Sequence, residues 1–294
     1  MAFTGTYIAL VTPFTKDNKI NVEKLKEMVE FHVKNGTDGL VPCGTTGESP
    51  TLSWDENKLV VKTVVEAAKG RLKVVAGTGS NCTEEAMEAT KFAKTIGADA
   101  ALIVSPYYNK PTQEGLYRHF KLIAEECDIP VMVYNILGRT GVNIETSTMA
   151  RLAKVKNIKA VKEASGNINQ ISDVIVSCPE LDVLSGDDSL TLPLMAVGGK
   201  GIVSVVGNII PFELKSLVNA INKGDMTKAK EIHQKLFPLC QSMFLETNPI
   251  PIREAMNLLG WDVGAARMPL TPMSDAPKQK LIQEMKAFGL KVNV

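Results

Sequence analysis

Short apolar runs alternate along the chain with longer segments in which apolar residues recur every three or four positions. Most of the short runs are apolar at almost every position, which is typical of parallel strands that are covered on both faces. We predict eight strands, near residues 6–11, 39–42, 73–76, 100–104, 130–134, 158–162, 182–185 and 201–204.

The longer segments between these runs carry helix signals. Ser53 and Glu56 have the spacing of a capping box, in which each side chain binds the backbone N–H of the other residue. Asn21 opens another helical pattern, which Gly36 closes. Eight strand and helix units in succession predict an α/β fold, a (β/α)8 TIM barrel. A doubly wound open sheet has the same alternation and is the main alternative.

The pattern changes after residue 224. Three helical stretches follow with no strand between them, near residues 225–244, 250–259 and 275–288. This tail is too short to build a large core of its own, so we expect it to pack on the barrel. We therefore predict a (β/α)8 barrel over residues 1–224 and a C-terminal helical domain over residues 225–294.

Composition and charge exclude several classes of protein. The chain has 294 residues, a formal net charge of +1 and a hydrophobic fraction of 45%, which is ordinary for a soluble globular protein. A charge so near zero provides no broad field to attract nucleic acid or an anionic membrane. We see neither a membrane span nor a secretion signal in the sequence. The five scattered cysteines form no CxxC pair, so we expect reduced thiols and a cytoplasmic location.

Common metal and hydrolase sites have no counterpart in the sequence. The three histidines, His32, His119 and His233, are isolated on helical patterns. Neither a histidine metal site nor a Ser-His triad is therefore indicated, and we expect three ordinary helix residues.

Lys162 ends the sixth predicted strand, in the segment IKAVKEASG. Catalytic groups of barrel enzymes lie at the carboxyl ends of strands. A lysine that is desolvated there has a lowered pKa, and its free amine can attack a carbonyl to form an imine. A surface lysine at the point where the strand leaves the core is the alternative reading.

Three loops that follow predicted strands carry further candidates. Residues 44–48, GTTGE, combine free backbone N–H groups with two hydroxyls and could hold a carboxylate, although a plain turn has the same composition. Tyr134 ends the fifth strand and is either a proton relay or an aromatic plug of the barrel. Arg139 provides a planar fork that suits a carboxylate, but a lone loop arginine is usually solvated. Residues 107–109, YYN, suit an active-site rim or an ordinary packed loop.

The chain contains, in this order, GTTGES, SPYYNKPTQEG, VYNILGRTGVNI, KEASGN and SGDD. As a set, these segments resemble the pyruvate-dependent lyase family that includes dihydrodipicolinate synthase and N-acetylneuraminate lyase. The resemblance covers almost the whole chain. It implies a barrel enzyme that forms a covalent imine with pyruvate and uses no metal and no organic cofactor.

The resemblance also implies a role for single residues. Lys162 matches the imine-forming lysine, and Tyr134, Thr45 and Tyr108 match the proton-relay residues. Thr45 and Thr46 match the loop that binds the pyruvate carboxylate. Because Tyr108 is expected to enter the site from a neighbouring subunit, the resemblance implies a homotetramer built as a dimer of dimers.

Arg139 decides between members of the family. Gly186 and Val203 match positions whose backbone lines the site, whereas an arginine at 139 is expected to meet the carboxylate of aspartate semialdehyde. The implied reaction condenses pyruvate with L-aspartate 4-semialdehyde, the first committed step of the diaminopimelate route to lysine. An aldolase of the same fold that acts on a sugar acid, such as 2-keto-3-deoxygluconate, or an N-acetylneuraminate lyase, is the alternative. A catalytically silent binding barrel is a different class, against which the intact Lys162 argues.

Family members that lysine inhibits bind it in a pocket at the tight dimer interface. Trp54 and Asn57 stand where inhibited bacterial members carry histidines, and Pro50 replaces a small alanine. Because Trp54 is bulky and has one donor, we expect it to fill this pocket, and Pro50 lacks a backbone N–H. Weak or absent inhibition by lysine is therefore expected. The candidate pocket residues are Ser49, Trp54, Asn57, Asn81, Glu85 and Tyr107.

Overall fold

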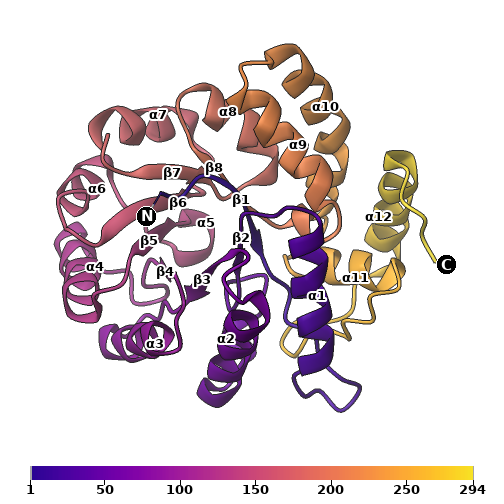
Figure 1. The fold of residues 1–294 in the computed structure, drawn as a ribbon, viewed down its shortest axis with the longest axis horizontal. Helices are drawn as coiled ribbons and strands as arrows, with labels where there is room; N and C mark the ends of the chain where they lie inside the picture. Colours follow the sequence, from indigo (N-terminus) through magenta and orange to yellow (C-terminus); the bar gives the residue numbers. More distant parts are fainter. Residues whose placement is uncertain (1, 294) are drawn as a thin grey trace.

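The structure, a computed structural model, describes residues 2–293. Eight parallel strands close into a barrel in the order of the chain, and β8 pairs with β1 to complete the ring (Figure 1). The closed ring confirms the (β/α)8 barrel and excludes the open sheet. The strands are β1 Gly5–Ala9, β2 Gly39–Val41, β3 Lys73–Gly77, β4 Ala100–Val104, β5 Val131–Asn135, β6 Ile158–Glu163, β7 Asp182–Ser185 and β8 Gly201–Ser204.

The first strand is shorter at its end than the predicted run, which extends to residue 11. Leu10 still donates its backbone N–H to Val41, at 3.0 Å, but the N–H of Val11 donates to the side chain of Asn208, at 3.2 Å. The apolar pattern continues beyond the strand because both residues stay buried in the core. An apolar pattern indicates burial, and a buried residue can lie beyond the end of its strand. The predicted end of the first strand is therefore too late.

Helices surround the barrel (Figure 1). The capping box of Ser53 and Glu56 is present at the start of α2, and Asn21 caps α1 by accepting from the backbone N–H of Lys24. The helices up to residue 222 are α1 Val22–Lys34, α2 Trp54–Ala68, α3 Thr83–Thr95, α4 Gln113–Cys127, α5 Leu137–Thr140, α6 Thr146–Leu152, α7 Ile168–Ser177, α8 Thr191–Ala196 and α9 Pro211–Asn222. Short 3-10 helices are η1 Ser49–Thr51, η2 Asp188–Leu190 and η3 Val206–Asn208.

Three helices form the C-terminal part: α10 Met226–Ser242, α11 Ile250–Leu258 and α12 Asp275–Phe288. They lie together on one side of the barrel, in orange to yellow in Figure 1, and α10 packs against α9 and α12. A domain boundary at residue 224 stays a prediction. No helix within residues 2–293 has the length and the apolar character that a membrane crossing requires.

The core has two parts. A large cluster fills the space between the strands and the helices, and a smaller one fills the interior of the barrel. Because side chains alternate along a strand, Ala160 and Lys162 of β6 face the interior while Val161 faces the helices. The interior cluster also contains Tyr134 and Val203.

Candidate active site

Lys162 and Tyr134 are neighbours at the carboxyl ends of their strands. The two Cα positions pair directly across β5 and β6. Lys162 is only 5% exposed, and its Nζ lies 4.1 Å from the centre of the Tyr134 ring. The structure thus buries the lysine in the barrel interior and excludes the reading of a solvated surface residue.

The pKa of Lys162 is lowered from 10.5 to about 7. Burial is the main cause, because desolvation penalises the charged ammonium form. The negative charge of Asp188 raises this pKa, and the positive charge of Arg139 lowers it further. A substantial fraction of the amine is therefore uncharged near neutral pH.

Tyr134 is buried, and burial raises the pKa of its hydroxyl to about 12. Arg139 and the side-chain hydroxyl of Thr45 act in the opposite direction. The structure therefore brings together a lysine from β6, a tyrosine from β5 and a threonine from the loop after β2.

Thr46 and Arg139 are connected through one residue of the C-terminal part. The Nδ2 of Asn248 donates to Oγ1 of the buried Thr46, at 3.1 Å. The Nη2 of Arg139 donates to the main-chain carbonyl oxygen of Asn248, at 3.0 Å. Two predicted carboxylate-binding residues are thus held by the segment between α10 and α11.

Gly186, which directly follows β7, borders the lysine, and Val203 of β8 belongs to the same barrel interior. A Cβ atom at position 186 would stand 3.1 Å from Cε of Lys162 and 2.7 Å from Cβ of Ala164. Val203 is fully buried in the interior cluster. Glycine at 186 therefore leaves the space that the lysine side chain occupies.

Asp188 is a buried carboxylate that the sequence analysis did not select, although it belongs to the SGDD segment. Its Oδ2 accepts from the backbone N–H groups of Val205 and Val206, at 2.9 and 3.0 Å, and its Oδ1 accepts from the hydroxyl of Ser204. Burial raises its pKa, and these hydrogen bonds lower it. The signal available in the sequence was a carboxylate three residues after the end of a predicted strand.

Glu48, at the end of the GTTGE loop, forms a buried ion pair that sequence reasoning also missed. Its Oε1 lies 2.5 Å from Nη2 of Arg253 in α11, and its Oε2 accepts from the backbone N–H of Arg267, at 2.9 Å. The loop is thus anchored to the C-terminal part by a charged pair whose rupture would leave a buried charge.

Tyr108 does not join this cluster within the single chain. Its side chain is 90% exposed, and its backbone has a positive φ of 71°. A non-glycine residue in this conformation is uncommon and is found mostly where a site or a turn requires it. The neighbouring Tyr107 is turned toward a different cavity.

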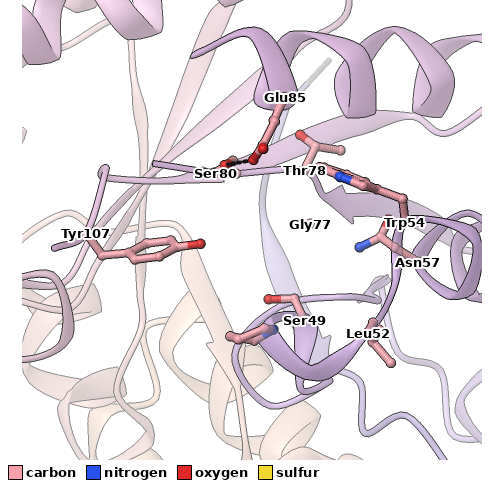
Figure 2. A pocket seen from close by; sticks show the side chains of 11 residues that line it. Ser49, Leu52, Trp54, Asn57, Gly77, Thr78, Ser80, Glu85 and Tyr107 are labelled. Atoms are coloured by element: carbon pink, nitrogen blue, oxygen red, sulfur yellow. Dashed lines mark hydrogen bonds between the residues drawn. The ribbon is translucent and has the colours of Figure 1, made fainter. Parts of the chain in front are cut away.

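That cavity has a volume of about 180 Å³ and is lined by five of the six candidate residues of the lysine pocket (Figure 2). Tyr107 points its hydroxyl into it from one side, and Trp54 and Asn57 face it from α2. Trp54 belongs to the lining of this cavity in the single chain, and the expectation that it fills the pocket at the dimer interface stays a prediction. Asn81 is not part of the lining. Its Nδ2 donates to the carbonyl oxygen of Tyr107, at 3.2 Å.

Glu85 is held at the edge of this cavity by the hydroxyl of Ser80, which donates to its Oε2 at 2.6 Å (Figure 2).

Within residues 2–293, no three His, Cys, Asp or Glu side chains are close enough to hold a metal ion. His32 and His119 are packed helix residues whose pKa values burial lowers, to about 3 and about 4.

The closed barrel, with a buried and partly uncharged lysine beside a tyrosine at the strand ends, defines an enzyme of the (β/α)8 class. The chain belongs to the Dihydrodipicolinate synthetase family, whose sequence profile matches residues 2–288. Its activity is that of a 4-hydroxy-tetrahydrodipicolinate synthase, a lyase of lysine and diaminopimelate biosynthesis.

Relatives match over the full length. A 4-hydroxy-tetrahydrodipicolinate synthase of Endomicrobium trichonymphae is 52% identical over 289 residues, which cover 98% of this chain and 99% of the relative. The crystal structure of the Aquifex aeolicus dihydrodipicolinate synthase has a TM-score of 0.97 and 48% identity, and the match covers 99% of this chain and 100% of that one.

Two further structures were solved with small molecules. The Acinetobacter baumannii enzyme, complexed with pyruvate, is 40% identical with a TM-score of 0.96, and the match covers 98% of this chain and 99% of that one. The Cyanidioschyzon merolae enzyme, with lysine bound, is 42% identical with a TM-score of 0.96 and the same coverage.

Proposed function

We propose that the site condenses pyruvate with L-aspartate 4-semialdehyde through an imine between pyruvate and Lys162. The observation that carries this proposal is a buried lysine at a strand end whose pKa lies at about 7. An amine with that pKa supplies the uncharged nucleophile near neutral pH. The pyruvate complex of a 40% identical relative supports pyruvate as the first substrate.

The proposed reaction passes through an imine and an enamine on Lys162. Nζ of Lys162 attacks the keto carbon of pyruvate, and loss of water gives a protonated imine. The positive imine acidifies the pyruvate methyl group, and removal of one proton gives an enamine that attacks the aldehyde carbon of the second substrate. The aldehyde oxygen takes up a proton and becomes a hydroxyl, while the imine on Nζ forms again. The amino group of the second substrate then attacks the imine carbon, and loss of Nζ as the free lysine amine closes the ring.

Proton transfer in these steps is assigned to Tyr134 and Thr45. Tyr134 lies against Nζ of Lys162, and the Thr45 hydroxyl stabilises its ionised form. A tyrosine held beside the reacting nitrogen can carry a proton between imine and solvent. Gly186 and Val203 shape the wall around the imine.

The carboxylates of the two substrates are assigned to different residues. Thr46, in the loop after β2, takes the pyruvate carboxylate with the help of neighbouring backbone N–H groups. Arg139, an exposed residue of the short helix α5, takes the carboxylate of aspartate semialdehyde and orients the aldehyde toward the enamine.

The proton relay is completed by Tyr108 from a neighbouring subunit in a homotetramer built as a dimer of dimers. Its 90% exposure and its positive φ support a role outside its own chain. Mixed dimers of Tyr108→Phe and Lys162→Ala subunits, each inactive alone, should regain activity, because one of their two sites is intact. Verified mixed dimers without activity would place Tyr108 in its own chain's site.

The cysteines of the enzyme bear on its proposed location in the cytoplasm. All five cysteines are free, which supports a reducing cytoplasm.

A coupled assay that follows consumption of pyruvate with aspartate semialdehyde tests the function as a whole. Cleavage of 2-keto-3-deoxygluconate or N-acetylneuraminate in place of this condensation would contradict it.

A further inference from the structure

We propose that Asn248 is a positioning residue for the pyruvate carboxylate, and that the C-terminal part is therefore a working component of the active site. The proposal rests on the proposed role of Thr46. Asn248 lies between α10 and α11, 202 positions from Thr46 in sequence, yet the two side chains are in direct contact.

The Asn248 amide donates this hydrogen bond, and that determines where the hydroxyl hydrogen of Thr46 can point. Nδ2 of Asn248 donates to Oγ1 of Thr46, so this amide hydrogen occupies one lone pair of the hydroxyl oxygen. The hydrogen of the Thr46 hydroxyl then points away from the amide and is available to an acceptor. A carboxylate oxygen of pyruvate is such an acceptor, and Asn248 sets the hydroxyl to donate to it.

The amide oxygen of Asn248 shows that an asparagine at this position costs stability. The residue is 5% exposed, and its Oδ1 is buried without a hydrogen-bond partner. An apolar residue of the same size would avoid an unpaired buried acceptor. A polar residue retained under this penalty is typical of a functional site rather than of packing.

The main chain of Asn248 binds a different residue, Arg139. Its carbonyl oxygen accepts from Nη2 of Arg139, and a change of side chain leaves that group in place. The side chain therefore acts on pyruvate through Thr46, while the main chain acts on the second substrate through Arg139.

Asn248→Leu separates these effects, because leucine has a similar volume but no donor. We expect the pyruvate KM to rise about 3- to 10-fold, while the KM for aspartate semialdehyde changes less than about twofold. The melting temperature should stay within about 2 °C of wild type, because the unpaired Oδ1 is removed together with the hydrogen bond. Asn248→Asp should raise the pyruvate KM at least as much, because its carboxylate turns the Thr46 hydroxyl toward itself.

Asn257→Leu is the matched control in the same part of the chain. The Asn257 amide holds only backbone, donating to Gly264 at 3.0 Å and accepting from Val263 at 2.8 Å. This variant should lose stability and keep its pyruvate KM. An unchanged pyruvate KM in Asn248→Leu, or equal rises for both substrates, would overturn the inference.

Borohydride trapping of pyruvate on Lys162 distinguishes this outcome from failure of the proposed function. At saturating pyruvate, Asn248→Leu should be trapped as completely as wild type, with the half-maximal pyruvate concentration raised by the same factor as KM. No trapping on wild-type Lys162 would contradict the function itself.

Discussion

Lys162 occupies space that Gly186 leaves open. A Cβ atom at position 186 would approach Cε and Cγ of the lysine to 3.1 and 3.2 Å and Cβ of Ala164 to 2.7 Å. The last contact is closer than real Cβ atoms tolerate. The lysine conformation thus depends on a residue 24 positions away that contributes only backbone.

Gly186→Ala should displace the Lys162 side chain and lower kcat at least about 10-fold, because small misplacements of a nucleophile are costly. Folding should survive, and circular dichroism together with initial rates would show both effects. Gly138→Ala is the control, since a Cβ there meets nothing within 4 Å. Equal activity of the two variants would show that the clash relaxes without consequence.

The uncharged amine of Lys162 predicts a pH dependence. The folded pKa is depressed to about 7, so the lysine is protonated below that pH and nucleophilic above it. The kcat/KM for pyruvate should therefore rise as the pH increases through about 7 and then level off. A profile that is flat between pH 6 and 8 would contradict the assignment.

Asp188→Asn should move that rising limb to lower pH, because the Asp188 charge raises the pKa of Lys162. Asp99→Asn removes a carboxylate at the opposite end of the barrel, where it accepts from the backbone N–H of Val74 at 2.8 Å. The pH profile of this control should match that of wild type. Identical shifts in both variants would indicate a general loss of charge instead.

Arg139→Ala should raise the KM for aspartate semialdehyde about 10- to 150-fold, since a charged bidentate contact contributes roughly 1.5–3 kcal/mol. The KM for pyruvate should change much less. Arg118→Ala, which removes only an exposed pair with Glu114, is the control and should leave both constants unchanged. Equal increases for both substrates would argue that Arg139 shapes the whole site.

The alternation of strands and helices predicted an α/β fold with a barrel as the favoured form, because each strand is buried on both faces and each helix has one apolar side. The closing pair of β1 and β8, which excludes the open sheet, came only from the structure. The same alternation placed Lys162 and Tyr134 at strand ends. The role of Asn248 could not be predicted from the sequence, because its contact with Thr46 spans 202 positions. The same holds for the pair of Glu48 and Arg253, which spans 205 positions. No local pattern carries such long-range contacts, and only the packing of the C-terminal helices on the barrel creates them.

Lysine should inhibit weakly or not at all. The cavity beside Tyr107 is open in the single chain, so this expectation now depends on its chemistry: Trp54 offers one donor, and Pro50 has no backbone N–H. A ligand that binds both states of the enzyme poorly cannot shift them. Initial rates at sub-saturating pyruvate should stay nearly constant as lysine is added. Strong inhibition below about 1 mM would show that the cavity binds lysine after all.

The central claim, an imine on Lys162, is tested most directly by borohydride reduction in the presence of pyruvate, followed by peptide mass mapping. Wild type and Lys159→Ala, a change on the same strand, should both carry one reduced pyruvate adduct on Lys162. Lys162→Ala should carry none and lose most activity. An adduct on a different lysine of the wild-type protein, or no adduct at all, would contradict the account.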